Sequence, residues 1–179
     1  MTEKELIKGC TAKDVRCQRI LFERYAGRML SVCRRYARDQ REAEDMLQEA
    51  FIRIFAYIHQ FEFSGSFEGW IRRITVNASL RYLSQRKIEF SPLGEQDSFS
   101  VTADDLTALD NLGVEELLRM IASLPLGYRI VFNLYAVEGY THDEIAALLG
   151  IQPVTSRTQL RKARKMLQEK ILGSTKTIH

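Results

Sequence analysis

The sequence predicts an all-α protein with two small helical domains joined by an acidic flexible linker, the second domain containing a helix-turn-helix. Apolar residues recur with a helical period over most of the chain, and no stretch shows the sustained alternation of a β-strand. Between residues 88 and 110 the period is lost, and Ser, Asp and Thr dominate beside Pro92 and Gly94. The expected parts are a first domain over 1–87, the linker over 88–112, a second domain over 113–173 and a tail over 174–179.

The hydrophobic period predicts the helices of each domain in turn. In the first domain we expect them over 3–9, 13–38, 41–59 and 66–86. In the second domain we expect them over 114–123, 126–138, 142–149 and 154–172. Each domain is too small to bury a large core alone.

Composition narrows the class of protein. A hydrophobic content of 45% with 27% charged residues is ordinary for a soluble globular chain, and the net charge of +3 is small. The charge is unevenly spread, because residues 88–113 contain six acids and no Lys or Arg, whereas 72–87 and 157–170 are basic. Two cationic modules joined by an anionic segment are typical of a chain that lies along nucleic acid.

Cysteine usage and the first residues predict a cytoplasmic protein. Cys10, Cys17 and Cys33 form no Cys-x-x-Cys pair, and the odd count argues against a disulfide framework or a zinc site. We expect Cys33 to be a small core residue. The first ten residues have no apolar run of signal-peptide length, and no segment approaches transmembrane length. We therefore expect no membrane insertion.

The segment 141–167 carries the most specific functional pattern. Thr141 and Glu144 form a Thr-x-x-Glu capping box, in which the hydroxyl and the carboxylate each accept a hydrogen bond from a backbone N–H. The helix that they start is expected to end at Gly150, since glycine adopts the left-handed conformation without a steric cost. Pro153 suits the first turn of the next helix, where its missing N–H is not needed. The inward-facing residues of the first helix are expected to be Ile145, Ala146, Leu148 and Leu149.

The second helix of this pair has one apolar and one basic face. Leu160, Ala163 and Leu167 share a face at helical spacing. Cations recur on another face, namely Arg157, Arg161, Arg164 and Lys165. A basic helix face is often merely solvated, but here the cap, the turn glycine and the basic face occur together. We therefore predict a helix-turn-helix whose second helix enters the major groove of DNA.

Aromatic residues and cations crowd the segment 61–87. Ser64, Gly65 and Ser66 form a short loop whose backbone can approach a ligand closely. Aromatic rings interleaved with cations suit single-stranded nucleic acid, because bases stack or flip into pockets while cations track phosphates. Four residues at helical spacing are nevertheless more often plain core, namely Phe67, Trp70, Ile71 and Ile74. The functional candidates are then the loop and the cations Arg72, Arg73, Arg81, Arg86 and Lys87.

The expected helix over 41–59 is amphipathic and carries acids on a second face. Its buried stripe is expected to comprise Ala43, Met46, Leu47, Ala50, Phe51, Ile54 and Ile58. Glu42, Asp45 and Glu49 share another face, where acids in the first turn also favour the helix dipole. A magnesium-dependent enzyme would need oxygen ligands from other helices, and the sequence shows no second acid cluster. We expect no catalytic residue, metal or cofactor, and interpret this face, with Ile52 exposed, as a docking surface for a protein.

Two stretches resemble the sigma factors of bacterial RNA polymerase. AEDMLQEAFIRIF followed by FEFSGSFEGWIRRITVNASLRYL is similar to their promoter-melting domain. LPLGYRIVFNLYAVEGYTHDEIAALLGI and RTQLRKARKML resemble their −35-reading domain. The presence of just these two domains resembles the extracytoplasmic-function (ECF) type, and the resemblance covers about residues 13–86 and 114–167.

The resemblance implies a role for each group of residues. Docking on the clamp of core RNA polymerase is implied for Asp45, Gln48, Glu49 and Ile52. Contacts with the melted −10 element are implied for Ser64, Gly65, Ser66, Arg72, Arg73, Asn77 and Arg81, with a flipped base in the loop. At the −35 element, base contacts are implied for Arg157, Thr158 and Arg161. Contacts with the DNA backbone there are implied for Lys162, Arg164 and Lys165.

Two residues depart from the pattern of the family. Ser156 stands where a Val or Ile usually packs against the preceding helix, and Arg161 replaces a side chain that is often apolar or aromatic. We predict a non-enzymatic ECF-type sigma factor whose partners are core RNA polymerase, promoter DNA and an anti-sigma factor. The alternative is a stand-alone helix-turn-helix repressor or activator, which leaves the loop and the acidic face without a role.

Overall fold

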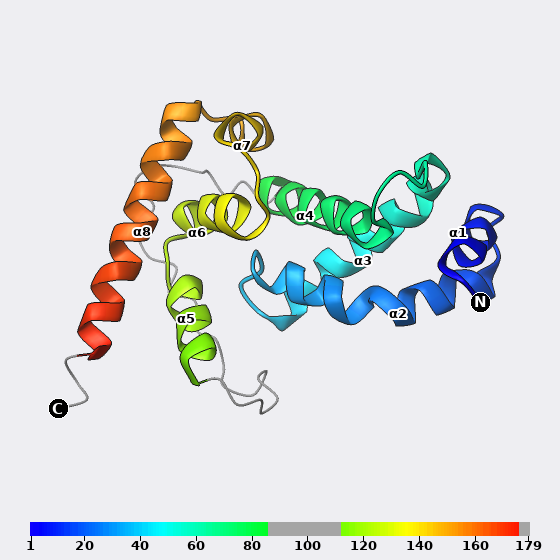
Figure 1. The fold of residues 1–179 in the computed structure, drawn as a ribbon, viewed down its shortest axis with the longest axis horizontal. Helices are drawn as coiled ribbons and strands as arrows, with labels where there is room; N and C mark the ends of the chain where they lie inside the picture. Colours follow the sequence, from blue (N-terminus) through cyan, green and yellow to red (C-terminus); the bar gives the residue numbers. More distant parts are fainter. Residues whose placement is uncertain (86–111, 176–179) are drawn as a thin grey trace. The chain divides into compact units, whose positions relative to one another are not determined.

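The computed structural model describes residues 1–85 and 112–175, and the chain divides into two compact units, 1–88 and 89–179 (Figure 1). Every regular element of the described residues is helical, so the predicted fold class is confirmed. The acidic linker expected over 88–112 lies outside the described residues, except for Leu112, which already begins a helix. None of the described helices is both long and apolar enough to cross a bilayer.

The first unit is built on three long helices. The helices are α1 (Glu3–Thr11), α2 (Val15–Arg34), α3 (Gln40–Tyr57) and α4 (Phe67–Gln85), with a short 3-10 turn η1 (Ile58–Gln60) after α3. Each of α2, α3 and α4 packs against the other two, and α1 packs on α2 and η1. The core between them is apolar and fully buried, with Leu21, Met29, Met46, Ile54, Ile71 and Leu83 at its centre. Cys33 is also fully buried, as expected.

Local caps set the ends of these helices. The single helix expected over 13–38 spans only Val15–Arg34. It begins later than expected because Lys13 takes a positive φ of 61°. Asp14 then caps α2 by accepting bonds from the N–H groups of Arg16 and Cys17. Asp39 caps α3 by accepting a bond from the N–H of Glu42 at 2.8 Å. A side-chain oxygen that satisfies an end N–H makes these positions natural helix starts.

The second unit is organised around one long helix. Its elements are α5 (Leu112–Ala122), α6 (Leu126–Phe132), a π-helical turn η3 (Asn133–Val137), α7 (His142–Leu149) and α8 (Pro153–Thr175). α8 packs against α5, α6 and α7 (Figure 1). The helix expected over 126–138 thus changes from α to π geometry at Asn133. α8 also continues through Gly173 to Thr175, so the first residues of the expected tail are helical.

Candidate nucleic-acid interfaces

α7 and α8 form the helix-turn-helix that the sequence predicts. At the start of α7, the hydroxyl of Thr141 accepts a bond from the N–H of Glu144 at 3.2 Å, and the Glu144 carboxylate accepts one from the N–H of Thr141 at 2.8 Å. Gly150 ends α7 in the left-handed conformation with φ 66°, and α8 begins at Pro153. These local predictions are confirmed. The expectation for Leu148 is wrong, because this side chain is exposed while Ile145 and Ala146 are buried.

The two faces of α8 separate as expected, with two polar residues added to the buried side. Leu160, Ala163 and Leu167 are buried in the unit. Ser156 and Gln159 are buried beside them, which the apolar spacing did not indicate. Thr158 is half-buried, and its hydroxyl donates to the carbonyl of Val154 at 3.0 Å. The other predicted −35 residues are all exposed, namely Arg157, Arg161, Lys162, Arg164 and Lys165.

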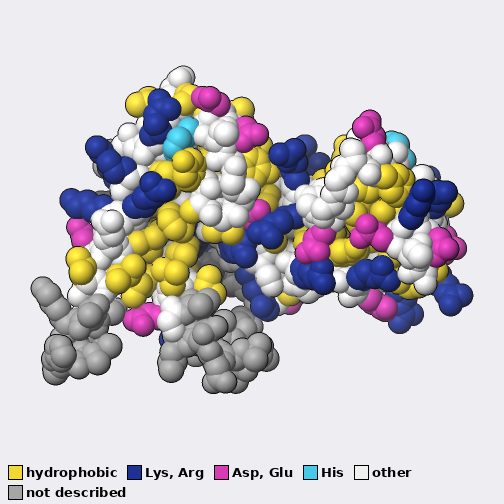
Figure 2. All heavy atoms as spheres, in the orientation of Figure 1, with side chains coloured by type: hydrophobic (Ala, Val, Ile, Leu, Met, Phe, Trp, Pro, Cys, Tyr) yellow, Lys and Arg dark blue, Asp and Glu magenta, His cyan; other side chains and the backbone are white. Residues whose placement is uncertain are grey.

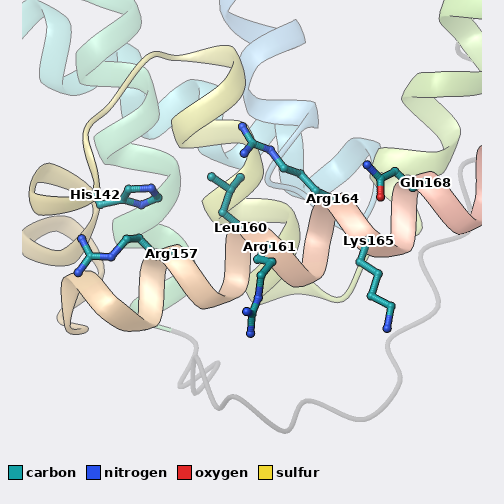
Figure 3. Close-up of a pocket in the computed structure, with 7 residues that line it drawn as sticks. All are labelled: His142, Arg157, Leu160, Arg161, Arg164, Lys165 and Gln168. Atoms are coloured by element: carbon teal, nitrogen blue, oxygen red, sulfur yellow. The ribbon is translucent and has the colours of Figure 1, made fainter.

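The exposed cations of α8 line an open groove. Figure 2 shows Lys and Arg side chains gathered over the N-terminal half of α8, with a histidine among them. The groove is lined by His142, Arg157, Leu160, Arg161, Arg164, Lys165 and Gln168. In the close-up of Figure 3, His142 and Arg157 lie side by side at one end, while Arg161 and Lys165 point away from the body of the unit. A row of cations along one helix suits the phosphates and base edges of a DNA groove.

The sequence interpretation missed two residues of this groove, Gln168 and His142, and His142 makes the more specific contacts. Its Nδ1 lies 2.9 Å from the hydroxyl of Ser156, and its ring stacks on Tyr135 with 4.6 Å between centroids. The guanidinium of Arg164 lies 5.7 Å from the centre of the same Tyr135 ring. Partial burial, followed by the charges of Arg157 and Arg164, lowers the pKa of His142, whereas Asp143 acts in the opposite direction. Two features of the sequence could have indicated this contact: His142 directly follows the helix cap Thr141, and Ser156 occupies a position where an apolar residue is expected.

In the first unit, the loop before α4 is exposed and conformationally unusual. Phe63 and Gly65 both have positive φ values, 58° and 94°. Phe63 is 47% exposed, and its ring contacts Phe61 edge-on at 5.2 Å between centroids. A bulky residue in the left-handed region is strained, and such strain is concentrated at functional sites. Ser64, Gly65 and Ser66 are all exposed there.

The hydroxyl of Ser66 already has a structural role. It accepts a bond from the N–H of Gly69 at 3.2 Å, which caps the first turn of α4. Phe67 and Ile71 are buried, so the core interpretation is correct for them. Trp70 and Ile74 are only half-buried. Trp70 stacks on Phe67 with 5.8 Å between ring centroids, so the aromatic residues under the loop form one packed cluster.

α4 presents a polar row beside this loop. Arg73, Asn77 and Arg81 are all exposed and recur every four residues, which places them along one side of the helix. Arg72 is half-buried on a neighbouring side. The two remaining candidates, Arg86 and Lys87, lie outside the described residues. The loop directly precedes α4, and the row continues along this helix from Arg73 to Arg81, so the −10 candidates that the structure describes follow one another along a single segment.

The acidic face of α3 is narrower than expected. Glu42 is only 3% exposed: its carboxylate accepts a bond from the backbone N–H of Arg38 at 2.5 Å and pairs with that residue's guanidinium. The interpretation of Glu42 as part of an outward acidic face was therefore wrong, because the chain turns back over it before α3. Asp45, Gln48 and Ile52 are exposed, with Ile52 at 65%. Glu49 is half-buried and pairs with Arg53 at 2.6 Å.

Comparison with protein families matches both units. Residues 21–88 match the family described as Sigma-70 region 2, and residues 114–167 match Sigma-70, region 4. The chain is 33% identical over 155 residues to the ECF RNA polymerase sigma factor SigE of Mycolicibacterium smegmatis, covering 83% of this chain and 59% of that relative. It is 27% identical over 182 residues to the ECF RNA polymerase sigma-E factor of Escherichia coli K12, covering 96% of this chain and 95% of that one.

Solved structures show the same fold at lower identity. The sigma factor RpoE of Bartonella quintana, solved with the anti-sigma factor NepR, matches with a TM-score of 0.54 and 19% identity over 84% of this chain and 94% of that chain. CnrH, solved with the cytosolic domain of CnrY, matches with a TM-score of 0.50 and 18% identity over 96% of this chain and 97% of that chain. At these identities the likeness supports the fold.

Proposed function

This chain belongs to the ECF-type sigma factors of RNA polymerase, and from that premise we propose that it binds core RNA polymerase and directs promoter-specific initiation of transcription. One observation carries the proposal. The helix-turn-helix of the second unit has a basic outer face, and the first unit of the same chain bears an exposed, strained loop followed by a helix with cations on its exposed side. Duplex reading and strand capture need these two different surfaces. The chain itself performs no bond-making step, which belongs to the polymerase.

In this proposal the second unit reads the −35 element. Arg157 and Arg161 stand one turn apart on the exposed side of α8, and the arginine fork matches the two acceptors of guanine in the major groove. The hydroxyl of Thr158 donates within its own helix, which leaves its oxygen and methyl group for a base edge. Lys162, Arg164 and Lys165 hold the DNA backbone and so position the helix.

The first unit melts the −10 element in the same scheme. A base that leaves the stack enters the loop of Ser64, Gly65 and Ser66, where Gly65 has no Cβ to block the approach of its backbone. The amide of Asn77 donates to and accepts from the edge of a neighbouring base. Arg72, Arg73 and Arg81 hold phosphates of the separated strand. In this proposal the promoter-melting and polymerase-binding domain covers 1–87, the linker 88–112 and the −35-reading domain 113–173.

Core RNA polymerase docks on α3. Asp45, Gln48, Glu49 and Ile52 follow the spacing i, i+3, i+4, i+7, which places them on one side of the helix, opposite the buried stripe. Ile52 is a large apolar side chain that is mostly exposed among polar residues, and such a side chain suits a contact with another protein. An anti-sigma factor that covers one or both units completes the proposed set of partners, and the protein works in the cytoplasm with its polymerase.

Co-purification with core RNA polymerase tests the proposal, followed by run-off transcription on a library of promoter fragments. We expect a stable complex and new, sequence-restricted start sites. Asp45→Ala should weaken the complex while leaving −35 recognition intact. Glu23→Ala is the matched control, because it removes the same charge from an exposed position on another helix, α2. A chain that ignores core polymerase but shifts duplex DNA alone would be a stand-alone regulator instead.

A further inference from the structure

The open groove along α8 contains a histidine that is held by three elements of the second unit. His142 begins α7, its Nδ1 lies 2.9 Å from Ser156 Oγ on α8, and its ring stacks on Tyr135 of η3 with planes 19° apart. Ser156 is 0% exposed, so its hydroxyl is available only to groups inside the unit. The ring is therefore fixed in orientation. Among the described residues, its second nitrogen, Nε2, has no hydrogen-bond partner, and the side chain lines the groove beside Arg157 (Figure 3).

We propose that His142 is a proton-linked contact to a phosphate of the −35 duplex, with Nε2–H as the donor and the cationic ring as the tighter-binding form. The inference rests on the proposed function and names a further DNA-binding residue of the same site. A phosphodiester carries a full negative charge and only acceptor oxygens, so it pairs better with an imidazolium than with a neutral ring. Arg164, which the proposed function places against the DNA backbone, attracts the same phosphates.

Ser156 allows the ring to change its protonation state without losing this contact. When His142 is neutral with its hydrogen on Nε2, the serine hydroxyl donates to Nδ1. When the ring is protonated, Nδ1–H donates and the serine oxygen accepts. A hydroxyl can do both by rotating, whereas an apolar side chain such as Val or Ile can do neither. The departure at Ser156 thus has a physical role, because it keeps the ring oriented in both states.

The charges around His142 set the direction of the pH effect. Arg157 and Arg164 on α8 oppose protonation and Asp143 on α7 favours it, while Tyr135 on η3 stacks on the ring. In the free protein burial and these arginines lower the pKa of His142. A bound phosphate favours the cation, so the pKa in the complex is higher than in the free protein. DNA binding then takes up a proton between the two pKa values. Affinity is greatest below the free-protein pKa and falls as pH rises through the pKa of the complex.

The test measures the affinity of the holoenzyme, full chain with core polymerase, for a duplex carrying the −35 element. Affinity is measured from about pH 5.5 to about pH 8.5, the range in which histidine titrates, at several salt concentrations. His142→Gln keeps a hydrogen-bond donor but cannot titrate in this range. His59→Gln is the matched control, since His59 is exposed on η1 in the first unit. Thermal unfolding of each variant verifies that the second unit is intact.

We expect wild type and His59→Gln to gain affinity as pH falls, by at most about tenfold per pH unit for one proton. At low pH, the slope of their log affinity against log salt concentration should steepen by up to about 0.9, the value for one added phosphate contact. His142→Gln should lose both effects and match wild type at high pH. Ser156→Ala should move the pH dependence to lower pH, because the cationic ring loses its acceptor.

Equal pH dependence in wild type and His142→Gln, with core association intact, would overturn this inference and leave the proposed function standing. Loss of pH dependence with an unchanged salt slope would also overturn it, since the histidine would then act on the protein fold and not on a phosphate. Failure of the wild-type chain to associate with core polymerase would refute the proposed function itself.

Discussion

The two units hold their candidate DNA-binding surfaces in place with different kinds of contact. Beneath the loop of the first unit lies an aromatic cluster, in which the ring centroid of Phe67 is 5.1 Å from Phe61 and 5.8 Å from Trp70. In the second unit the recognition helix α8 is tied to α7 through Ser156 and His142. Aromatic packing stabilises a fold in proportion to the apolar area that it buries, so its loss lowers the free energy of unfolding. A polar contact instead fixes the orientation of the side chains that it joins, and it depends on their charge. Loss of packing under the loop should therefore lower the stability of the first unit, whereas loss of an exposed polar group on α8 should change DNA binding without unfolding the second unit.

The largest effect is expected from Phe67→Ala. Phe67 is 1% exposed and also meets Tyr25 of α2 edge-on at 5.7 Å, so truncation leaves a cavity between three aromatic rings. We expect the free energy of unfolding of the first unit to fall by about 3–5 kcal/mol. Urea unfolding followed by the fluorescence of Trp70, the only tryptophan of the chain, reports on this unit.

Phe63→Ala is the matched control for that variant. Phe63 is 47% exposed and strained at φ 58°, so its loss removes one edge contact but little buried area. The free energy of unfolding should change by less than about 1 kcal/mol. Equal destabilisation by both variants would contradict the view that the cluster under the loop, and not the loop itself, stabilises the first unit.

A smaller effect, confined to DNA binding, is expected from Arg157→Ala in the second unit. Arg157 is exposed beside His142, so its removal leaves the core of α8 unchanged. Binding to the −35 element should weaken by roughly 1–3 kcal/mol and lose specificity at one position, with core binding unaltered. Competition binding of the holoenzyme against mutated −35 duplexes measures both.

Lys165→Ala provides the contrast within the same helix. A lysine that holds a phosphate carries no sequence information, so its loss should weaken binding to all duplexes alike. The slope of log affinity against log salt concentration should fall in magnitude by about 1. If Arg157→Ala behaves in this uniform way too, its assignment as a base reader is wrong.

The smallest effect is expected from Thr141→Ala. This change removes the cap of α7, in which the hydroxyl accepts a bond from the Glu144 N–H at 3.2 Å. We expect a loss of about 1 kcal/mol in the free energy of unfolding of the second unit. Circular dichroism should detect the shift, while Trp70 fluorescence should not, because it lies in the first unit. A shift in both signals would mean that the units unfold together.

Several features of the candidate sites followed from the sequence, and others did not. The cap at Thr141, the turn at Gly150 and the exposed cations of α8 depend on residues within a few positions of one another, so the sequence pattern predicts them. The bond between His142 and Ser156 joins residues 14 apart on two helices, and it depends on how these helices cross. The burial of Glu42 depends on the turn at Arg38 that covers its carboxylate.

The sequence by itself determined the helical class, the order of the helices, the cap at Thr141 and the family. These are products of local hydrogen bonds and of the 3.6-residue period, which act within one helix. Only the tertiary structure decided which polar side chains are buried and what they bind. Gln159 illustrates the difference: it is buried on α8, and its amide nitrogen lies 3.8 Å from the place of a Cβ on Gly127 of α6. A helix period identifies the side that faces inward, but the shape of the opposing helix decides whether a polar group can be accommodated there.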